Sequence, residues 1–331
     1  MSEFFSAAAD LSMIQEMKKN MVLAVLKLVL PITAMLLIGM AARKWQWFGI
    51  EGAQAFRTIV GKVMLPAVLL DAFIFADYST DILVIGGMVL VWMLLAMGIG
   101  YLARRIMKEH GAYLPFLVTA DEVGMLGYSL IGLLFGSAGI ASLAMCDLGH
   151  TFFVFAIGVP LLLLVTGQHT SVKSVLNGII HSYPFDAMMI GIVLGLLGVG
   201  RLINENEAVG TIYHAMIDMI SGPTTALILI SLGYELTFRK EVMKSVIRAY
   251  AIRMIIMAGV GALCSFLIFR FVPYSKTLMT ALLLLVILPP SFSMAIFGDL
   301  GDEGEFVSTT MSFGTLVGLI LYIGVSVFAL S

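Results

Sequence analysis

Charged residues are scarce in this chain of 331 residues. Asp, Glu, Lys and Arg together make up 12% of it, whereas a typical soluble domain has about 25%. Hydrophobic residues make up 60%, and the mean hydropathy is +1.04. This composition excludes an ordinary soluble fold and predicts an all-α integral membrane protein in contact with membrane lipid. The few basic residues form no patch of the kind that binds nucleic acid, so we expect no nucleic-acid partner.

Cysteine is almost absent, and so are the motifs of catalysis. Cys146 and Cys264 both fall in apolar segments, where they indicate neither a disulfide framework nor a zinc site. The acidic stretch 299–305 lacks the glycine and glutamate spacing of an EF-hand calcium loop. No nucleophile–base constellation, phosphate-binding glycine loop or Walker motif is present. The sequence therefore gives no support for an enzyme, an ATP-driven pump or a resident cofactor.

Long apolar runs dominate what is present. A helix needs roughly 20 apolar residues to cross a bilayer, and ten such runs occur. These predicted spans, numbered in chain order, are 21–42, 56–76, 82–103, 112–136, 139–166, 185–200, 209–233, 246–271, 277–298 and 306–330. The polar stretch 167–184 is the longest break. It divides the chain into a first five-helix repeat, 21–166, and a second, 185–331.

The distribution of Lys and Arg predicts the orientation. Five spans per half is an odd number, so the second half must enter the membrane inverted relative to the first. The loops after spans 1, 3, 5 and 7 carry most of the basic loop residues and are therefore expected on the cytoplasmic side. The segment 1–20 and both termini would then be extracytoplasmic, the linker 167–184 would be cytoplasmic, and the protein would span the plasma membrane.

Pro289 and Pro290 interrupt span 9. Each proline lacks an N–H and clashes with the carbonyl one turn back, so the backbone opens at membrane depth. Such an opening is tolerated only where it lines a cavity or is buried in protein. Ser291 and Ser293 place hydroxyls beside the break. The pattern is typical of a broken helix at a transport site, and the alternative is a proline kink that only shapes packing.

A related pattern occurs upstream at an offset of 162 positions (297 minus 135). Phe135 to Gly139 aligns with Phe297 to Gly301, and Gly127 to Ser129 aligns with Pro289 to Ser291. Paired interruptions in two halves of a chain indicate a transport site near the bilayer midplane. We therefore predict a secondary transporter with inverted repeats and broken spans 4 and 9.

Four stretches resemble the auxin efflux carrier family, within the larger group that includes bile-acid sodium symporters. They are Leu30 to Gly39 followed by Arg43 and Lys44, Val63 to Leu70, Gly222 to Leu236, and Leu288 to Ser291. The resemblance implies a homodimer with a static scaffold of spans 1, 2, 6 and 7. It implies a mobile transport domain of spans 3–5 and 8–10, crossing broken helices, elevator-type alternating access, and organic anions as usual substrates.

One departure from the family pattern concerns span 4. The family usually reads Asn-x-Gly-x-x-Gly-x-Pro there, whereas this chain has Glu122, Gly124, Gly127 and Ser129 at the aligned positions. The two glycines can still supply a break. The glutamate puts the anionic-substrate inference in doubt and leaves a cationic or zwitterionic solute as an alternative. A membrane sensor that binds without transporting is a further alternative.

Ionisable residues inside spans are functional candidates, because their burial in a membrane is costly. Asp121 and Glu122 could hold sodium, carry a proton, or bind a cationic solute. Asp147 and His150 lie three residues apart, on one face of a helix. They could form a proton relay, bind a cation, or pair only with each other. Asp71 could face the solute from the scaffold. Further polar residues receive no site role: Lys62, His214, Asp218, Arg248, Arg253, Ser312 and Thr315.

Overall fold

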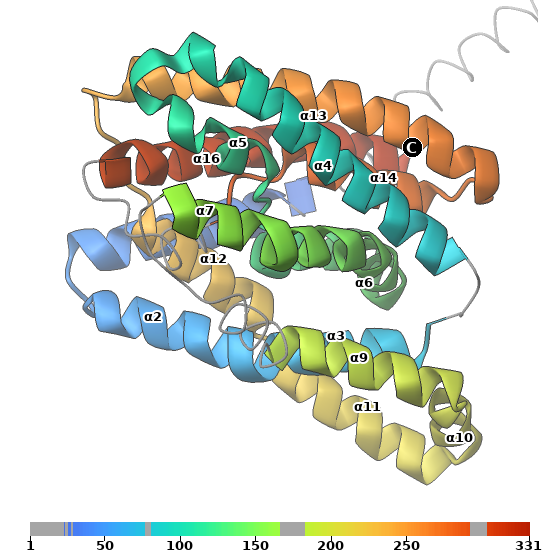
Figure 1. Cartoon of the computed structure of the whole chain (residues 1–331). Helices are drawn as coiled ribbons and strands as arrows, with labels where there is room; N and C mark the ends of the chain where they lie inside the picture. Colours follow the sequence, from blue (N-terminus) through green and yellow to red (C-terminus); the bar gives the residue numbers. More distant parts are fainter. Residues whose placement is uncertain (1–22, 24–25, 28, 77–80, 166–182, 292–302) are drawn as a thin grey trace, which may run out of the picture.

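Every regular element in the described part of the chain is a helix (Figure 1). The computed structural model describes residues 23, 26, 27, 29–76, 81–165, 183–291 and 303–331. The segment 1–20, most of the linker 167–184, and Ser293 lie outside these residues. The prediction of an all-α fold is thus confirmed for the part that is described.

Among the described residues, five helices are long and apolar enough to cross a membrane, and a bent pair raises the number to six. Four of the five agree with predicted spans 3, 7, 8 and 10: Asp81–Met107, Glu207–Glu235, Met243–Phe271 and Gly304–Leu330. The bent pair covers Asp186–Leu196 and Val199–Glu205, which meet at 69° around Gly198, a glycine with φ +75°. A multi-pass membrane protein is supported, while the full set of ten spans stays a prediction.

The fifth long helix folds back on itself at Gly136, which has φ +57°. The Tyr128 hydroxyl donates a 2.9 Å hydrogen bond to Asp147 Oδ2. In a straight helix, residues nineteen apart would be separated by about 28 Å of rise. A Cβ on Gly139 would also lie 2.8 Å from the Ile131 carbonyl oxygen. The segment is therefore two antiparallel helices, and the turn lies at the predicted boundary between spans 4 and 5.

The first of two groups of helices includes α3, which packs against α9 and α11 on one side of the molecule (Figure 1). Gly39 and Gly233 let the helix 29–44 lie directly against α12, because a Cβ on either would overlap a backbone carbonyl of the other helix. The group comprises the helix 29–44, α2 (Ile50–Ile59), η1 (Val60–Met64), α3 (Leu65–Ile74), α9 (Tyr183–Leu196), α10 (Val199–Glu205), α11 (Glu207–Ser221) and α12 (Thr224–Glu235).

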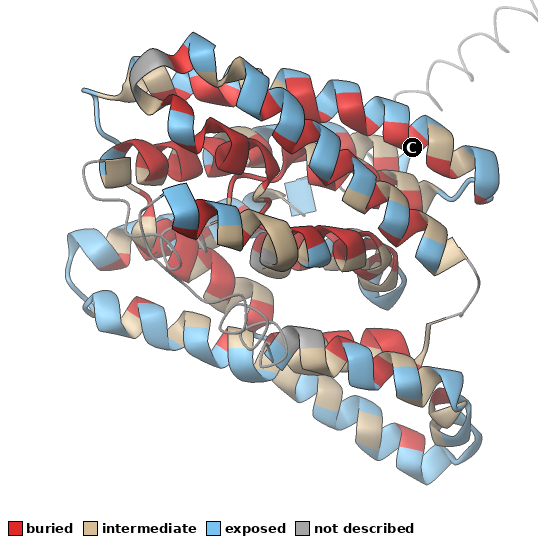
Figure 2. Ribbon diagram, viewed as in Figure 1, coloured by how far each residue is buried: buried red, intermediate tan, exposed pale blue. Residues whose placement is uncertain are grey.

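The second group packs around α4, α13 and α14 and faces the first group through α6. Buried residues concentrate here, whereas α2 and α11 are mainly exposed or intermediate (Figure 2). The group comprises α4 (Asp81–Met107), η2 (Lys108–Tyr113), α5 (Leu114–Thr119), η3 (Val123–Gly127), α6 (Tyr128–Phe153), η4 (Val154–Gly158), α7 (Val159–Val165), α13 (Met243–Phe271), α14 (Lys276–Ile287) and α16 (Gly304–Leu330).

Gly149 brings α6 and α4 into direct backbone contact. A Cβ at this position would overlap the Gly86 carbonyl oxygen and lie 2.8 Å from the Leu90 nitrogen. We expect Gly149→Ala to destabilise the fold by about 1–3 kcal/mol, because the helices must move apart. Gly87→Ala is the matched control, since a Cβ there meets nothing within 4 Å. Thermal midpoints of the purified variants check this, and equal midpoints would contradict it.

Candidate functional site

The two interrupted helices meet through their extended residues. Helix α5 ends at Thr119 and α14 ends at Ile287. The Glu122 N–H donates to the Pro289 carbonyl at 2.9 Å, and the Ser291 N–H donates to the Ala120 carbonyl at 2.6 Å. Asp121 and Pro290 form an antiparallel bridge between these contacts. We call residues 120–122 and 288–291 the crossing.

The two breaks have different causes. Leu288 precedes a proline and takes the extended ψ of 140° that this position favours. Ala120 is also extended, with ψ 90°, but it is followed by Asp121 rather than by a proline or glycine. Gly124 and Gly127 lie in the π-helical turn η3 that follows, rather than in the break itself. A Cβ on Gly127 would lie 3.0 Å from the Leu288 side chain, so this glycine serves close packing at the crossing.

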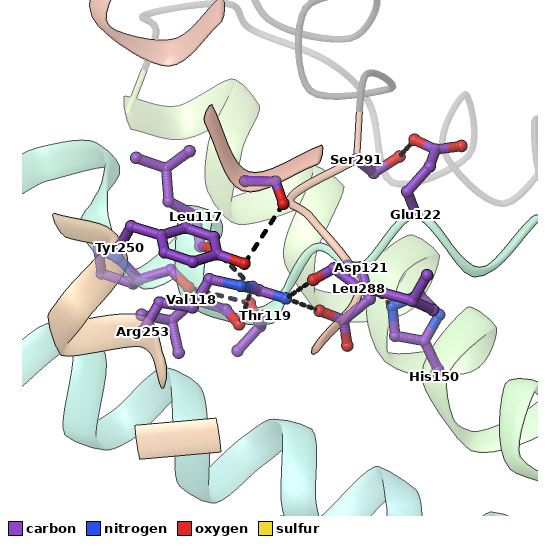
Figure 3. A network of polar contacts seen from close by, with 12 residues as sticks. Leu117, Val118, Thr119, Asp121, Glu122, His150, Tyr250, Arg253, Leu288 and Ser291 are labelled. Atoms are coloured by element: carbon purple, nitrogen blue, oxygen red, sulfur yellow. Dashed lines mark hydrogen bonds and ion pairs between the residues drawn. The ribbon is translucent and has the colours of Figure 1, made fainter. Parts of the chain in front are cut away.

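Arg253 of α13 holds both broken ends (Figure 3). One guanidinium nitrogen, Nη1, donates to the carbonyls of Leu117 and Val118 at 2.7 and 2.5 Å. The other, Nη2, donates to the Leu288 carbonyl at 2.6 Å and forms an ion pair with Asp121. The C-terminal carbonyls of a helix lack partners within the helix and carry negative partial charge. A single side chain, 1% exposed, therefore caps α5 and α14 together.

Asp147 and His150 extend this network from α6. The Asp121 N–H donates to His150 Nε2 at 3.3 Å, so Nε2 is the nitrogen without a proton. The other ring nitrogen, Nδ1, therefore carries the proton and donates it to Asp147 Oδ1 at 3.1 Å. Asp147 also accepts from Tyr128 and Thr151, at 2.9 and 3.0 Å. The structure thus brings both residues to the first break.

Glu122 points away from its neighbour Asp121. Its carboxylate accepts a 2.8 Å hydrogen bond from the Ser291 hydroxyl, which joins the two broken segments through side chains as well as backbone (Figure 3). Glu122 is buried, as are Pro289 and Pro290. The two adjacent carboxylates therefore have separate partners and do not form one shared site in this conformation.

A cavity of about 210 Å³ lies between the two groups of helices. Ser129 of α6 and Thr224 of α12 line it from opposite sides, and Leu65, Val68 and Ile228 supply apolar surface. Both hydroxyl oxygens are buried without a hydrogen-bond partner among the described residues. Buried polar groups are normally hydrogen-bonded, so two such hydroxyls facing one cavity indicate a place for a polar ligand. We call this the inner cavity.

A second cavity of about 510 Å³ adjoins the first, and Val68, Ile140 and Ser221 line both. Its wall includes Asp71 of α3, His214 and Asp218 of α11, and the turn at Gly136. His214 Nε2 lies 3.3 Å from Asn204 Oδ1. We call this the vestibule. Asp71 thus faces this cavity from the first group of helices and lies away from the crossing.

Arg253 receives no site role from the sequence, although the structure places its side chain at the crossing. Arg248, five residues earlier on the same helix, receives no site role either. The structure separates them, because Arg248 is exposed whereas Arg253 is buried at the crossing. The apolar residues on both sides of Arg253 were the available signal, since they place its charge inside the membrane. Ser312 and Thr315 donate to carbonyls of their own helix, as packing hydroxyls do.

The chain has a relative among known proteins that is named as a transporter. The chain is 26% identical over 300 residues to a protein named as an uncharacterized transporter from Methanothermobacter thermautotrophicus strain Delta H. The aligned region covers 88% of this chain and 94% of that protein. No family model matches the chain, so membership of the auxin efflux carrier family stays a prediction. The chain is therefore similar, along most of its length, to a protein named as a transporter.

Proposed function

We propose that this protein is a secondary transporter that moves a small organic solute across the plasma membrane by alternating access. One observation carries the proposal: two interrupted helices are held together by a buried polar network, beside a cavity with unpartnered hydroxyls. Interrupted helices that pair at membrane depth are the usual construction of a transport site. The relative named as a transporter supports the same class. We propose no catalytic role.

The two groups of helices supply the moving parts in this proposal. The first group would be the scaffold and the second the transport domain, as the resemblance to the auxin efflux carrier family implies. Their contact through α3 and α6 contains both cavities, so sliding along it would carry a bound solute past the scaffold. Exposed apolar side chains on α11, such as Ile212 and Met219, would face lipid or a second copy in a homodimer.

The charges of the vestibule favour a solute that bears an ammonium group. Asp71 and Asp218 line it, neither forms an ion pair with Lys or Arg in the described residues, and no lining residue is Lys or Arg. An organic anion, which the family resemblance implies, would meet two carboxylates there. The inner cavity has the volume of about seven water molecules in the liquid, which suits a solute of amino-acid size. We therefore favour an amine or zwitterion.

A thermal-shift screen of the purified protein against amines, amino acids and carboxylates tests this proposal. We expect an amine or amino acid to raise the unfolding midpoint, because a ligand bound to the native state stabilises it. Asp71→Asn and Asp218→Asn should each weaken the apparent affinity about tenfold. Glu207→Gln is the matched control, since Glu207 is exposed at the start of α11.

Transport itself is tested with the best ligand in proteoliposomes. A carrier loaded with unlabelled solute should accumulate labelled solute by exchange, whereas a channel or a sensor should not. Stabilisation by carboxylates alone would reject the proposed solute class. Ligand binding without exchange would reject transport and favour the sensor.

A further inference from the structure

The oxygen atoms around Arg253 form a set that would suit a metal cation. Three are carbonyl oxygens, of Leu117, Val118 and Leu288, and the fourth belongs to the Asp121 carboxylate. Carbonyl and carboxylate oxygens are the ligands of hard cations. The C-terminal ends of interrupted helices are also where transporters coordinate sodium or protons. In this chain a guanidinium occupies the centre of that set (Figure 3).

The balance of charges around Arg253 disfavours binding of a second cation at this position. One guanidinium faces one carboxylate, and both side chains are buried. Of the neighbouring carboxylates, Glu122 is bonded to Ser291, and Asp147 is surrounded by His150, Tyr128 and Thr151. A sodium ion beside Arg253 would share the same carbonyl lone pairs and be repelled in a medium of low dielectric constant.

We infer that Arg253 is a built-in cation: its guanidinium fills the position of a bound sodium ion at the crossing and makes binding of sodium there unnecessary. In this inference, the positive charge that the sequence analysis assigned to a sodium ion at Asp121 and Glu122 is supplied by the side chain of Arg253. The carbonyl ends of α5 and α14 stay neutralised at any sodium concentration. This inference deepens the proposed function, but it concerns cation binding and can be tested without any transport assay.

The test compares unfolding midpoints of the full-length protein in sodium, potassium and choline chloride at equal ionic strength. We expect the wild-type midpoint to be the same in all three salts. Arg253→Ala removes the guanidinium and leaves the oxygen set, so its midpoint in choline should be lower and should rise by about 5 °C in sodium. About 10 mM guanidinium, far below denaturing concentrations, should give a similar rise. Arg248→Ala, exposed on the same helix, should show neither effect.

Two results would overturn the inference. One is a wild-type midpoint that rises in sodium relative to potassium and choline. The other is an Arg253→Ala protein that folds but gains nothing from sodium or guanidinium. If Arg253→Ala does not fold, Arg253→Gln takes its place, because its amide can still donate to one of the carbonyls. Absence of transport in a separate assay would bear on the proposed function and leave this result unchanged.

Discussion

Replacing Asp121 by alanine is expected to lower the free energy of unfolding by about 3–5 kcal/mol. The change leaves the guanidinium of Arg253 buried without a counter-charge, and breaking one side of a buried ion pair costs that much. The effect is measured as a lower unfolding midpoint of the purified variant. If the variant is too unstable to purify, it is measured as a smaller folded peak in size-exclusion chromatography.

Two further variants show whether charge is the cause. Asp121→Asn keeps an oxygen that can accept from Arg253, so it should cost less than the alanine variant. Combining Asp121→Ala with Arg253→Met removes both charges. This double variant should recover part of the lost stability, because no buried charge is then left without a counter-charge. Full recovery is not expected, since three carbonyls lose their donor. A single Asp121→Ala variant as stable as the wild type would contradict this account.

The long apolar runs could be read directly from the sequence. The predicted spans 82–103, 246–271 and 306–330 lie within the helices α4, α13 and α16. These segments need only a bilayer's length of apolar residues, which is a local property. The break at Leu288 was likewise predictable, because proline acts on its own neighbours and on the preceding turn.

The break at Ala120 is of another kind. It has no local sequence signal, because the group that caps the end of α5 comes from Arg253, more than 130 positions away along the chain. Glycine was the only local candidate, which is why Gly124 and Gly127 were favoured over Ala120. The inner cavity could not be predicted either, since it forms between Ser129 and Thr224 of helices from different halves of the chain.

Linking the two groups of helices covalently is expected to abolish transport. Val68 of α3 and Ile140 of α6 line both cavities and are only partly buried, so cysteines at these positions should react with a short, reducible bifunctional reagent. If the second group must slide past the first, a tether of a few ångströms would hold it in place. We expect labelled-solute exchange to fall at least about tenfold, on the order of 1.4 kcal/mol in the transport barrier, and to return on reduction.

A pair within the second group provides the matched control. A Cβ on Gly86 lies 3.6 Å from the Leu148 Cβ, within the range for a disulfide, so Gly86→Cys with Leu148→Cys should cross-link α4 to α6. Both residues would move together, and exchange should continue. The native Cys146 and Cys264 are buried, so the reagent alone should leave the wild type active. Exchange at the control rate after complete Val68–Ile140 cross-linking would show that the groups do not slide, and the elevator proposal would fail.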